Sequence, residues 1–248
     1  LTLIGESGKE ALVSKEDVRH IYDVINSMRP LHGTGFDLFG AVYEMFASSK
    51  EKKDFGEYFT RRHYAHVFAK LLLRAERFYA PGRVFTVLDP ACGTGGFLTE
   101  GIKVLKNQFE QSDTLTGDAR SFLADKCFYG VDIRDENISR TRLNMFLVGD
   151  GHTNMRPENS LIPEKFPFKL HTFDYVITNP PYGTGTIRAD TTSISTVRTE
   201  IAFVCRIREL LRVGGQACII QPDGVLENPS WKAFRKELLE TFDITAVI

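Results

Sequence analysis

The apolar positions of the chain follow a helical period in the first eighty residues and change pattern afterwards. Helical spacing occurs at 15–28 and at 36–46, and a third helix is expected after Thr60, whose side chain could cap it. From there on, short apolar runs are each followed by an amphipathic stretch. The sequence therefore predicts a helical segment over 1–80 and an α/β domain over 81–248.

The predicted α/β domain contains four strands, each followed by a helix. The strands are expected at Val84–Leu88, Phe128–Val131, Tyr175–Thr178 and Gln216–Ile220, and the helices at Phe97–Asn107, Glu136–Val148, Glu200–Leu211 and Trp231–Glu240. The polar stretch Gln108–Lys126 is expected to be an inserted loop. Strands that alternate with helices form a doubly wound, mostly parallel sheet. In such a sheet, ligands bind at the carboxyl ends of the strands, near the topological switch point.

Composition and charge narrow the class of protein. Hydrophobic residues make up 42% and charged residues 25%, as in soluble globular proteins. The sequence has neither a visible signal peptide nor an apolar run near the roughly 20 residues of a membrane span. The four cysteines lack metal-binding spacing and are expected to be reduced, which predicts a cytoplasmic protein. The formal net charge of −1 gives no overall attraction to nucleic acid.

Both ends of the chain have features of an internal fragment. Residue 1 is Leu, and the chain stops inside the apolar run Ile244–Ile248, which resembles a strand. We therefore expect native sequence beyond both ends.

The first predicted strand leads directly into the glycine-rich stretch Asp89-Pro90-Ala91-Cys92-Gly93-Thr94-Gly95-Gly96. Glycines let the backbone turn tightly and approach a ligand closely, and the following helix offers free N–H groups. A P-loop is excluded because no Gly-Lys-Ser/Thr follows. A carboxylate at Asp89 would repel a pyrophosphate, but it suits a ligand with an ammonium or sulfonium charge. The plain alternative is a glycine-rich turn without a ligand.

Asp132 ends the second predicted strand. An acidic residue there can accept hydrogen bonds from both hydroxyls of a ribose. Its distance from the glycine-rich stretch exceeds the usual ~20 residues, and the predicted inserted loop accounts for the excess. An Asp that caps the next helix is the alternative. Together with the glycine-rich stretch, the ribose role is favoured.

The third strand runs into Asn179-Pro180-Pro181-Tyr182. Prolines have no N–H to donate, so the strand must end there. The Asn179 side-chain oxygen and the Pro180 carbonyl are two acceptors, which match the two hydrogens of an exocyclic amine. Tyr182 offers a face on which a planar base can stack. The stretch therefore predicts a site for an amine on a flat ring, with a rigid turn as the plain alternative.

The order of these motifs resembles the DNA amino-methyltransferases that use S-adenosylmethionine (AdoMet). It is more closely similar to the modification subunits of type I restriction-modification systems, which methylate adenine at N6. Tyr58–Thr60 and Pro222–Leu226 carry this narrower resemblance, and the resemblance as a whole covers nearly the entire chain. It implies a Rossmann-like AdoMet-dependent methyltransferase fold, with double-stranded DNA, a DNA-specificity subunit and a restriction subunit as partners.

The resemblance also implies a role for each matching residue. Asn179, Pro180, Pro181 and Tyr182 would hold the target adenine. The residues implied to bind AdoMet are Tyr58, Phe59, Thr60, Asp89, Ala91, Gly93, Thr94, Gly95, Asp132, Ile133 and Asn159. In this arrangement Tyr58, Phe59 and Thr60 close over the methionine end of AdoMet. Asp132 binds its ribose, and Ile133 packs on its adenine.

Two positions depart from the pattern of this group of enzymes. Arg61 stands where a Pro usually follows the Thr, and Asn159 stands where an Asp is more common. Neither change removes a group that the reaction needs, because Asn keeps an acceptor oxygen. Cytosine N4, RNA or a protein glutamine stay open as other amine substrates. A subunit that binds AdoMet but is inactive without a specificity partner also stays open as an alternative.

Other polar features suggest no chemistry of their own. His63 and His66 lie three apart without further nearby ligands, so no metal site is expected. Arg206, Arg208 and Arg212 are expected on a solvated helix face, with contact to DNA or a partner as the alternative.

Overall fold

The computed structural model describes the backbone of 2–4 and 10–12 and the full residues 60–74, 85–111, 121–149, 154–183 and 198–248. The chain divides into two compact units, Leu1–Gly35 and Phe36–Ile248. In the first unit, strand β1 (Thr2–Ile4) pairs antiparallel with β2 (Glu10–Leu12). No strands were predicted there. The helices predicted at 15–28 and 36–46 lie outside the described residues, and the division at residue 80 stays a prediction.

The second unit is built around a parallel sheet of five strands in the order β5-β4-β3-β6-β7. These strands are β3 (Val87–Asp89), β4 (Phe128–Asp132), β5 (Met155–Pro157), β6 (Phe173–Thr178) and β7 (Leu211–Ile219). The helices are α4 (Arg62–Leu72), α6 (Gly96–Gln111), α8 (Asp135–Leu147), α9 (Thr199–Leu210), α10 (Gly224–Glu227) and α11 (Lys232–Thr241). Short 3-10 turns lie at Pro163–Lys165 and Pro229–Trp231.

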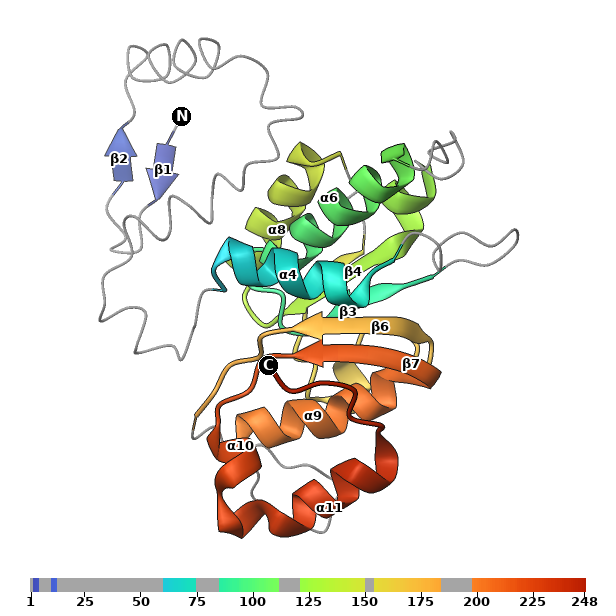
Figure 1. Cartoon of the computed structure of the whole chain (residues 1–248). Coiled ribbons are helices and arrows are strands. Elements are labelled where there is room, and N and C mark those ends of the chain that lie inside the picture. The colour runs from blue at the N-terminus through green and yellow to red at the C-terminus, as the bar shows by residue number, and fades with distance from the viewer. Residues whose placement is uncertain are drawn as a thin grey trace. The chain divides into compact units, whose positions relative to one another are not determined.

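Helices cover both faces of this sheet, as the alternation of strands and helices predicted (Figure 1). Helices α4, α6 and α8 lie on one face, and α9, α10 and α11 lie on the other. The chain moves outward from β3 to β4 and β5, and then crosses back to place β6 on the other side of β3. The switch point therefore lies between β3 and β6, and their carboxyl ends form the expected ligand position.

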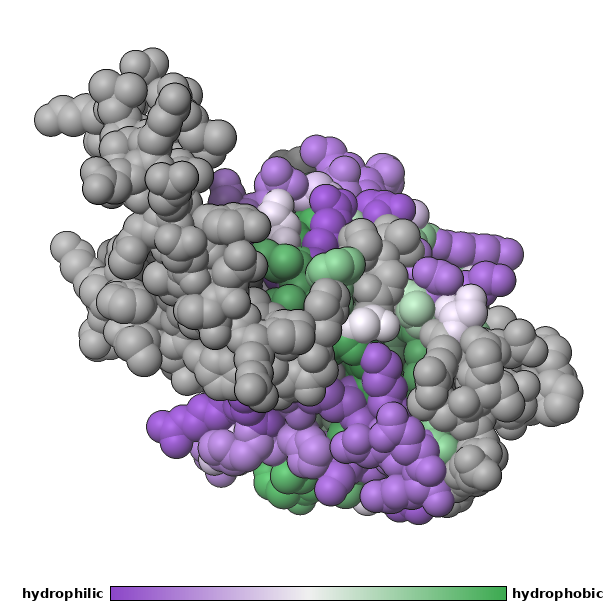
Figure 2. Space-filling model, turned by 90° about the horizontal axis from the view of Figure 1, so that it is seen from above, coloured by the Kyte–Doolittle hydropathy of each residue, from purple (hydrophilic) through white to green (hydrophobic). Residues whose placement is uncertain are grey.

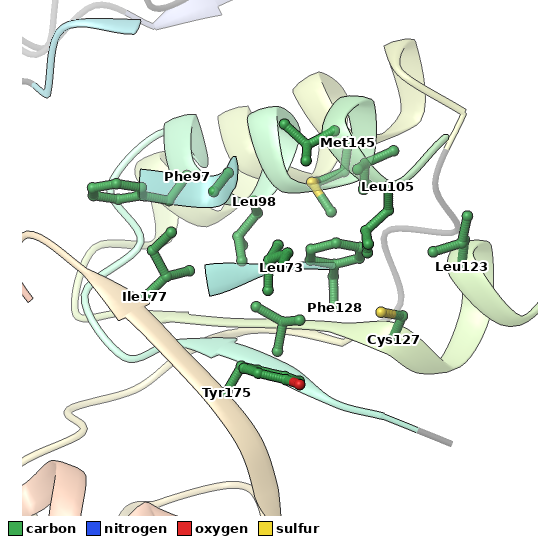
Figure 3. Packing of buried hydrophobic residues seen from close by; sticks show 14 of the residues in the cluster. Leu73, Phe97, Leu98, Leu105, Leu123, Cys127, Phe128, Met145, Tyr175 and Ile177 are labelled. Carbon is green, nitrogen blue, oxygen red and sulfur yellow. The ribbon is translucent and has the colours of Figure 1, made fainter. Parts of the chain in front are cut away.

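The larger core packs the sheet against α4, α6 and α8 (Figure 3). Leu98 and Leu105 of α6 meet Phe128 of β4 and Met145 of α8, all fully or almost fully buried. All six residues of β6 are buried, as expected for a strand that is covered on both faces. A second core on the other face joins Val131 and Val176 to Ile207 of α9. On the face shown in Figure 2, the coloured residues near the rim are mostly hydrophilic, and apolar residues are exposed near the middle.

Several predicted elements differ from the structure. The predicted loop Gln108–Lys126 is wrong at both ends, because α6 continues to Gln111 and a π-helix occupies Leu123–Cys127. Strand β5 was missed because it has three residues and ends on a proline, which only an edge strand tolerates. The apolar run 244–248 forms no strand, because it pairs with none of the described strands.

Helix α4 leaves part of its apolar surface exposed. Ala65, Ala69 and Leu72 are buried, whereas Val67 and Leu71 are about half exposed. The two alanines allow α4 to pack closely against α6. The helix begins after Arg61, which has no side-chain cap, so the predicted capping role of Thr60 is wrong.

Candidate active site

The glycine-rich turn between β3 and α6 is held in shape by the end of β4. The Cys92 N–H donates to the Val131 carbonyl at 2.9 Å, and the Gly93 N–H donates to Asp132 Oδ2 at 3.0 Å. Gly93 and Gly95 have φ angles of +53° and +85°, which side chains disfavour. A Cβ on Gly95 would lie 2.9 Å from the Thr141 side chain, whereas one on Gly93 would enter open space. The turn thus exposes backbone beside Gly93 where a ligand can approach.

Asp89, the last residue of β3, is a buried carboxyl with a perturbed pKa. Only 1% of it is exposed, and its Oδ1 accepts a hydrogen bond from the Ala91 N–H at 3.1 Å. The pKa of Asp89 is raised from 3.8 to about 7, chiefly by burial and to a smaller extent by the nearby Asp132. The Thr178 hydroxyl and the Ala91 amide act in the opposite direction. Among the described residues no Lys or Arg pairs with Asp89, so a cationic group from a ligand fits this position.

Asp132, at the end of β4, links the glycine-rich turn to the start of α8 through hydrogen bonds. Besides the Gly93 N–H, its carboxylate accepts hydrogen bonds from the Arg134 N–H at 2.9 Å and from Asn137 Nδ2 at 3.1 Å. The N-cap of α8 is Arg134, so Asp132 is not the capping residue. Ile133, the next residue, is 70% exposed. An apolar side chain left exposed at this edge is available to cover a flat ligand.

The loop after β5 is fastened to the glycine-rich turn through a residue that sequence analysis missed. The Ser160 hydroxyl donates to the Pro90 carbonyl at 2.6 Å, and the neighbouring Asn159 Oδ1 accepts from the Leu161 N–H at 3.0 Å. Arg206 of α9 reaches this loop from the opposite face and donates to the Ser160 carbonyl at 2.7 Å. Nothing in the spacing of Ser160 or Arg206 indicated these contacts, because both depend on the crossing of distant segments.

The residues at the end of β6 meet the segment before α4. Asn179 Nδ2 donates to Thr60 Oγ1 at 2.9 Å, which joins two predicted motifs that are 119 positions apart. The Tyr182 hydroxyl is bonded to Asn179 Oδ1 and lies 3.1 Å from the Ile220 carbonyl. Pro180 is buried and Pro181 is exposed. The double proline therefore ends the strand with Asn179 and Tyr182 side by side.

The remaining predicted positions are distributed as follows. The Thr94 carbonyl accepts a hydrogen bond from Asn144 Nδ2 at 2.9 Å, which anchors the turn on α8. Tyr58 and Phe59 lie outside the described residues. Arg61 has a φ of −57°, within the range that a proline ring imposes, so the usual Pro could stand there without a change of backbone.

Of the three arginines expected on a solvated helix face, Arg208 is exposed on α9 as predicted. Arg206 is buried and Arg212 lies in β7, so the prediction was wrong for these two. Arg206 is 4% exposed and forms an ion pair with Glu209 besides its bond to Ser160. Arg208 pairs with Glu237 at 3.0 Å, and Arg212, which already belongs to β7, pairs with Asp174. Each of the three is paired with an acidic residue, and the Arg208 pair lies at the surface.

The arrangement of strands, glycine-rich turn and paired acceptors is that of an AdoMet-dependent methyltransferase fold. A solved structure from Listeria monocytogenes, assigned to the class I S-adenosylmethionine-dependent methyltransferases, superposes with a TM-score of 0.66 at 18% identity. That match covers 92% of this chain and 67% of the other. The likeness shows the fold.

The sequence comparisons define the family. The N-6 DNA Methylase family profile matches residues 34–248, so the chain belongs to that family. It is 31% identical over 231 residues to the EcoKI type I restriction enzyme methylase subunit of Escherichia coli (strain K12). This match covers 88% of this chain and 41% of that protein. It is 29% identical over 219 residues to the type II restriction enzyme and methyltransferase RM.BcgI of Heyndrickxia coagulans, with 87% and 32% covered. The chain thus spans less than half the length of either relative.

One further property concerns membranes. In the part of the chain that the structure describes, no helix combines the length and apolar character that crossing a bilayer requires.

Proposed function

We propose that this chain transfers a methyl group from AdoMet to the N6 amine of an adenine in double-stranded DNA, as the modification subunit of a type I restriction-modification system. The observation that carries the proposal is the junction of Asn179 with Thr60 and Tyr182 at the switch point of the sheet. Family membership supports the reaction, and the EcoKI relative supports the type of system. The likeness to RM.BcgI makes a different system the alternative.

The described residues fit AdoMet as the methyl donor. Asp89 lacks a described cationic partner and would pair with its ammonium, while the turn beside Gly93 leaves room for its amino-acid part. Asp132 would accept the ribose hydroxyls, Ile133 would cover its adenine, and Asn159 would accept from the adenine amine. When bound, AdoMet supplies a methyl group on a positively charged sulfur.

On the DNA side, the target base must leave the duplex, which costs a few kcal/mol. Stacking on Tyr182 and bonds to Asn179 and Pro180 offset this cost. The Asn179 oxygen now bonded to the Tyr182 hydroxyl would accept one N6 hydrogen instead. The Pro180 carbonyl would accept the other, which directs the nitrogen lone pair toward the methyl group. The main catalytic contribution is positioning, and the amine proton leaves after transfer.

A separate DNA-specificity subunit is part of the proposal. The net charge is −1, and the arginines of α9 and β7 are all paired within the protein. Binding to DNA then depends on a partner that recognises the sequence. A restriction subunit would complete the system.

The direct test is Asn179→Ala in the chain assembled with its specificity partner. We expect AdoMet affinity to stay near the wild-type value and methyl transfer to be abolished, because the amine loses its acceptor. Calorimetry measures the affinity, and mass spectrometry of digested DNA measures N6-methyladenine and N4-methylcytosine separately. Near-normal methylation by the variant would refute the mechanism, and N4-methylcytosine from the wild type would refute the substrate.

A further inference from the structure

A carboxylate outside the proposed site is entirely buried next to it. Glu200, the second residue of α9, is 0% exposed. Its Oε2 accepts a hydrogen bond from the Gly183 N–H at 3.2 Å, and its Oε1 lies 2.7 Å from Arg198 Nε. Burial of a carboxylate is unfavourable unless it is paired and hydrogen-bonded. An acidic residue near a helix N-terminus interacts favourably with the helix dipole even when it is exposed to water. The dipole therefore does not explain why Glu200 is buried.

The partner of Glu200 is the peptide that directly follows Tyr182. Gly183 has a φ of +131°, which side chains rarely adopt, and its carbonyl also receives the Thr199 hydroxyl at 3.5 Å. A Cβ at this position would meet nothing within 4 Å, so the backbone conformation is the reason for glycine. The first turn of α9 therefore holds Gly183 at both its backbone N–H and its backbone carbonyl.

We infer that Glu200 is a positioning residue for the target base. By fixing the Gly183 N–H it fixes the end of the loop that carries Tyr182, whose ring must lie beside Asn179 for a base to stack and bond at once. It contacts neither base nor AdoMet in this scheme. The inference rests on the proposed function for its catalytic consequence, whereas its structural part, the restraint on Gly183, stands independently.

Isotope labelling isolates the amide in question. Only two glycines of the chain follow a tyrosine, Gly130 and Gly183, so carbonyl-labelled tyrosine combined with nitrogen-labelled glycine selects their two amide signals. The Gly130 N–H donates to the Asn154 carbonyl at 3.1 Å, away from Glu200, and serves as the internal reference. Hydrogen exchange of Gly183 relative to Gly130 then reports the Glu200 contact in the whole chain.

For Glu200→Ala we expect the Gly183 amide to exchange about tenfold faster, the effect of losing one charge-assisted hydrogen bond, with Gly130 unchanged. Glu200→Gln keeps an acceptor oxygen and should give an intermediate rate. It also carries the test if the alanine variant does not fold. The matched control is Glu237→Ala, which removes an exposed carboxylate paired with Arg208 and should alter neither signal. Unchanged Gly183 exchange in both Glu200 variants would overturn the inference.

The kinetic part separates positioning from general stability. With the specificity partner and DNA, Glu200→Ala should lower kcat about 10- to 100-fold, the usual result of a small misplacement, while AdoMet affinity stays unchanged. Glu200→Gln should recover part of this loss. Faster Gly183 exchange without any change in kcat would contradict a positioning role. If the wild type itself methylated no adenine, the proposed function would fail, and the exchange result alone would decide whether Glu200 restrains the loop.

Discussion

Two buried aspartates stand at opposite ends of the parallel sheet and are treated differently by the protein. Asp174, near the start of β6, is 5% exposed, pairs with Arg212 and accepts the Thr86 N–H at 3.0 Å. Asp89, at the end of β3, is 1% exposed and has no described cationic partner. A structural carboxylate is thus neutralised by the protein, whereas a carboxylate left with a pKa of about 7 indicates a position for a ligand's charge.

The largest effect on stability is expected at the amino end of the sheet. Asp174→Ala should destabilise the fold by about 3 kcal/mol, because it leaves Arg212 and the Thr86 N–H without their partner. This is the low end of the range for buried ion pairs, since the Arg212 side chain is 35% exposed. Urea denaturation measures the change. AdoMet binding of the folded fraction should be retained, and loss of binding without loss of stability would contradict the division between the two ends.

At the carboxyl end of the sheet, replacement of the buried Asp89 by a neutral residue should stabilise the protein. The pKa of Asp89 is raised by folding, so its contribution to stability is complete below the unfolded pKa of 3.8 and is lost as the pH rises to about 7. Asp89→Asn avoids that loss. The pKa difference sets a ceiling of about 4 kcal/mol, and the weaker bond to Ala91 reduces the expected gain to about 2 kcal/mol above pH 7.

The measurement is urea denaturation of Asp89→Asn and wild type at about pH 5 and pH 8. The gain should be larger at the higher pH, and AdoMet binding should be weakened most at about pH 8, where Asp89 of the wild type is ionised. Asp174→Asn is the matched control, because it makes the same substitution in a buried aspartate that has its cation. It should destabilise the protein. A destabilised Asp89→Asn variant would mean that Asp89 is a structural residue as well.

The alternation of strands and helices and the carboxyl ends of β3, β4 and β6 were predictable because each depends on local sequence, whereas the short edge strand β5 was not. Apolar runs gave β3, β4 and β6, and the polar residues that follow them were located at one edge. Contacts between distant segments were not predictable. Ser160 and Glu200 carry no motif, and their partners Pro90 and Gly183 are known only once the chain crossings are known.

The arginines show why a helical pattern of charge is a weak guide to function. Arg206, Arg208 and Arg212 were predicted to share a solvated face. Arg206 is instead buried and pairs with Glu209 of its own helix, Arg212 pairs with Asp174 of β6, and Arg208 is exposed but pairs with Glu237 of α11. Residue type and spacing do not reveal whether a charge is neutralised by the protein. That distinction also separates Asp89 from Asp174, which are equally acidic in sequence and both stand in apolar strands.

The smallest of the expected effects is the pH dependence of AdoMet affinity. It should depend on Asp89 at the carboxyl end of the sheet and not on Asp174 at the amino end. An ammonium binds the ionised form of Asp89, whose pKa in the free protein is about 7. Affinity should therefore fall as the pH drops below 7, approaching about tenfold per pH unit, or 1.4 kcal/mol. Above about pH 8 it should fall again, because the ligand's own α-amino group loses its proton.

Calorimetry in buffers of different ionisation enthalpy should detect proton release on binding near pH 7. The acid limb should disappear in Asp89→Asn and persist in Asp174→Asn, and an acid limb that survived in Asp89→Asn would assign the titration to another group.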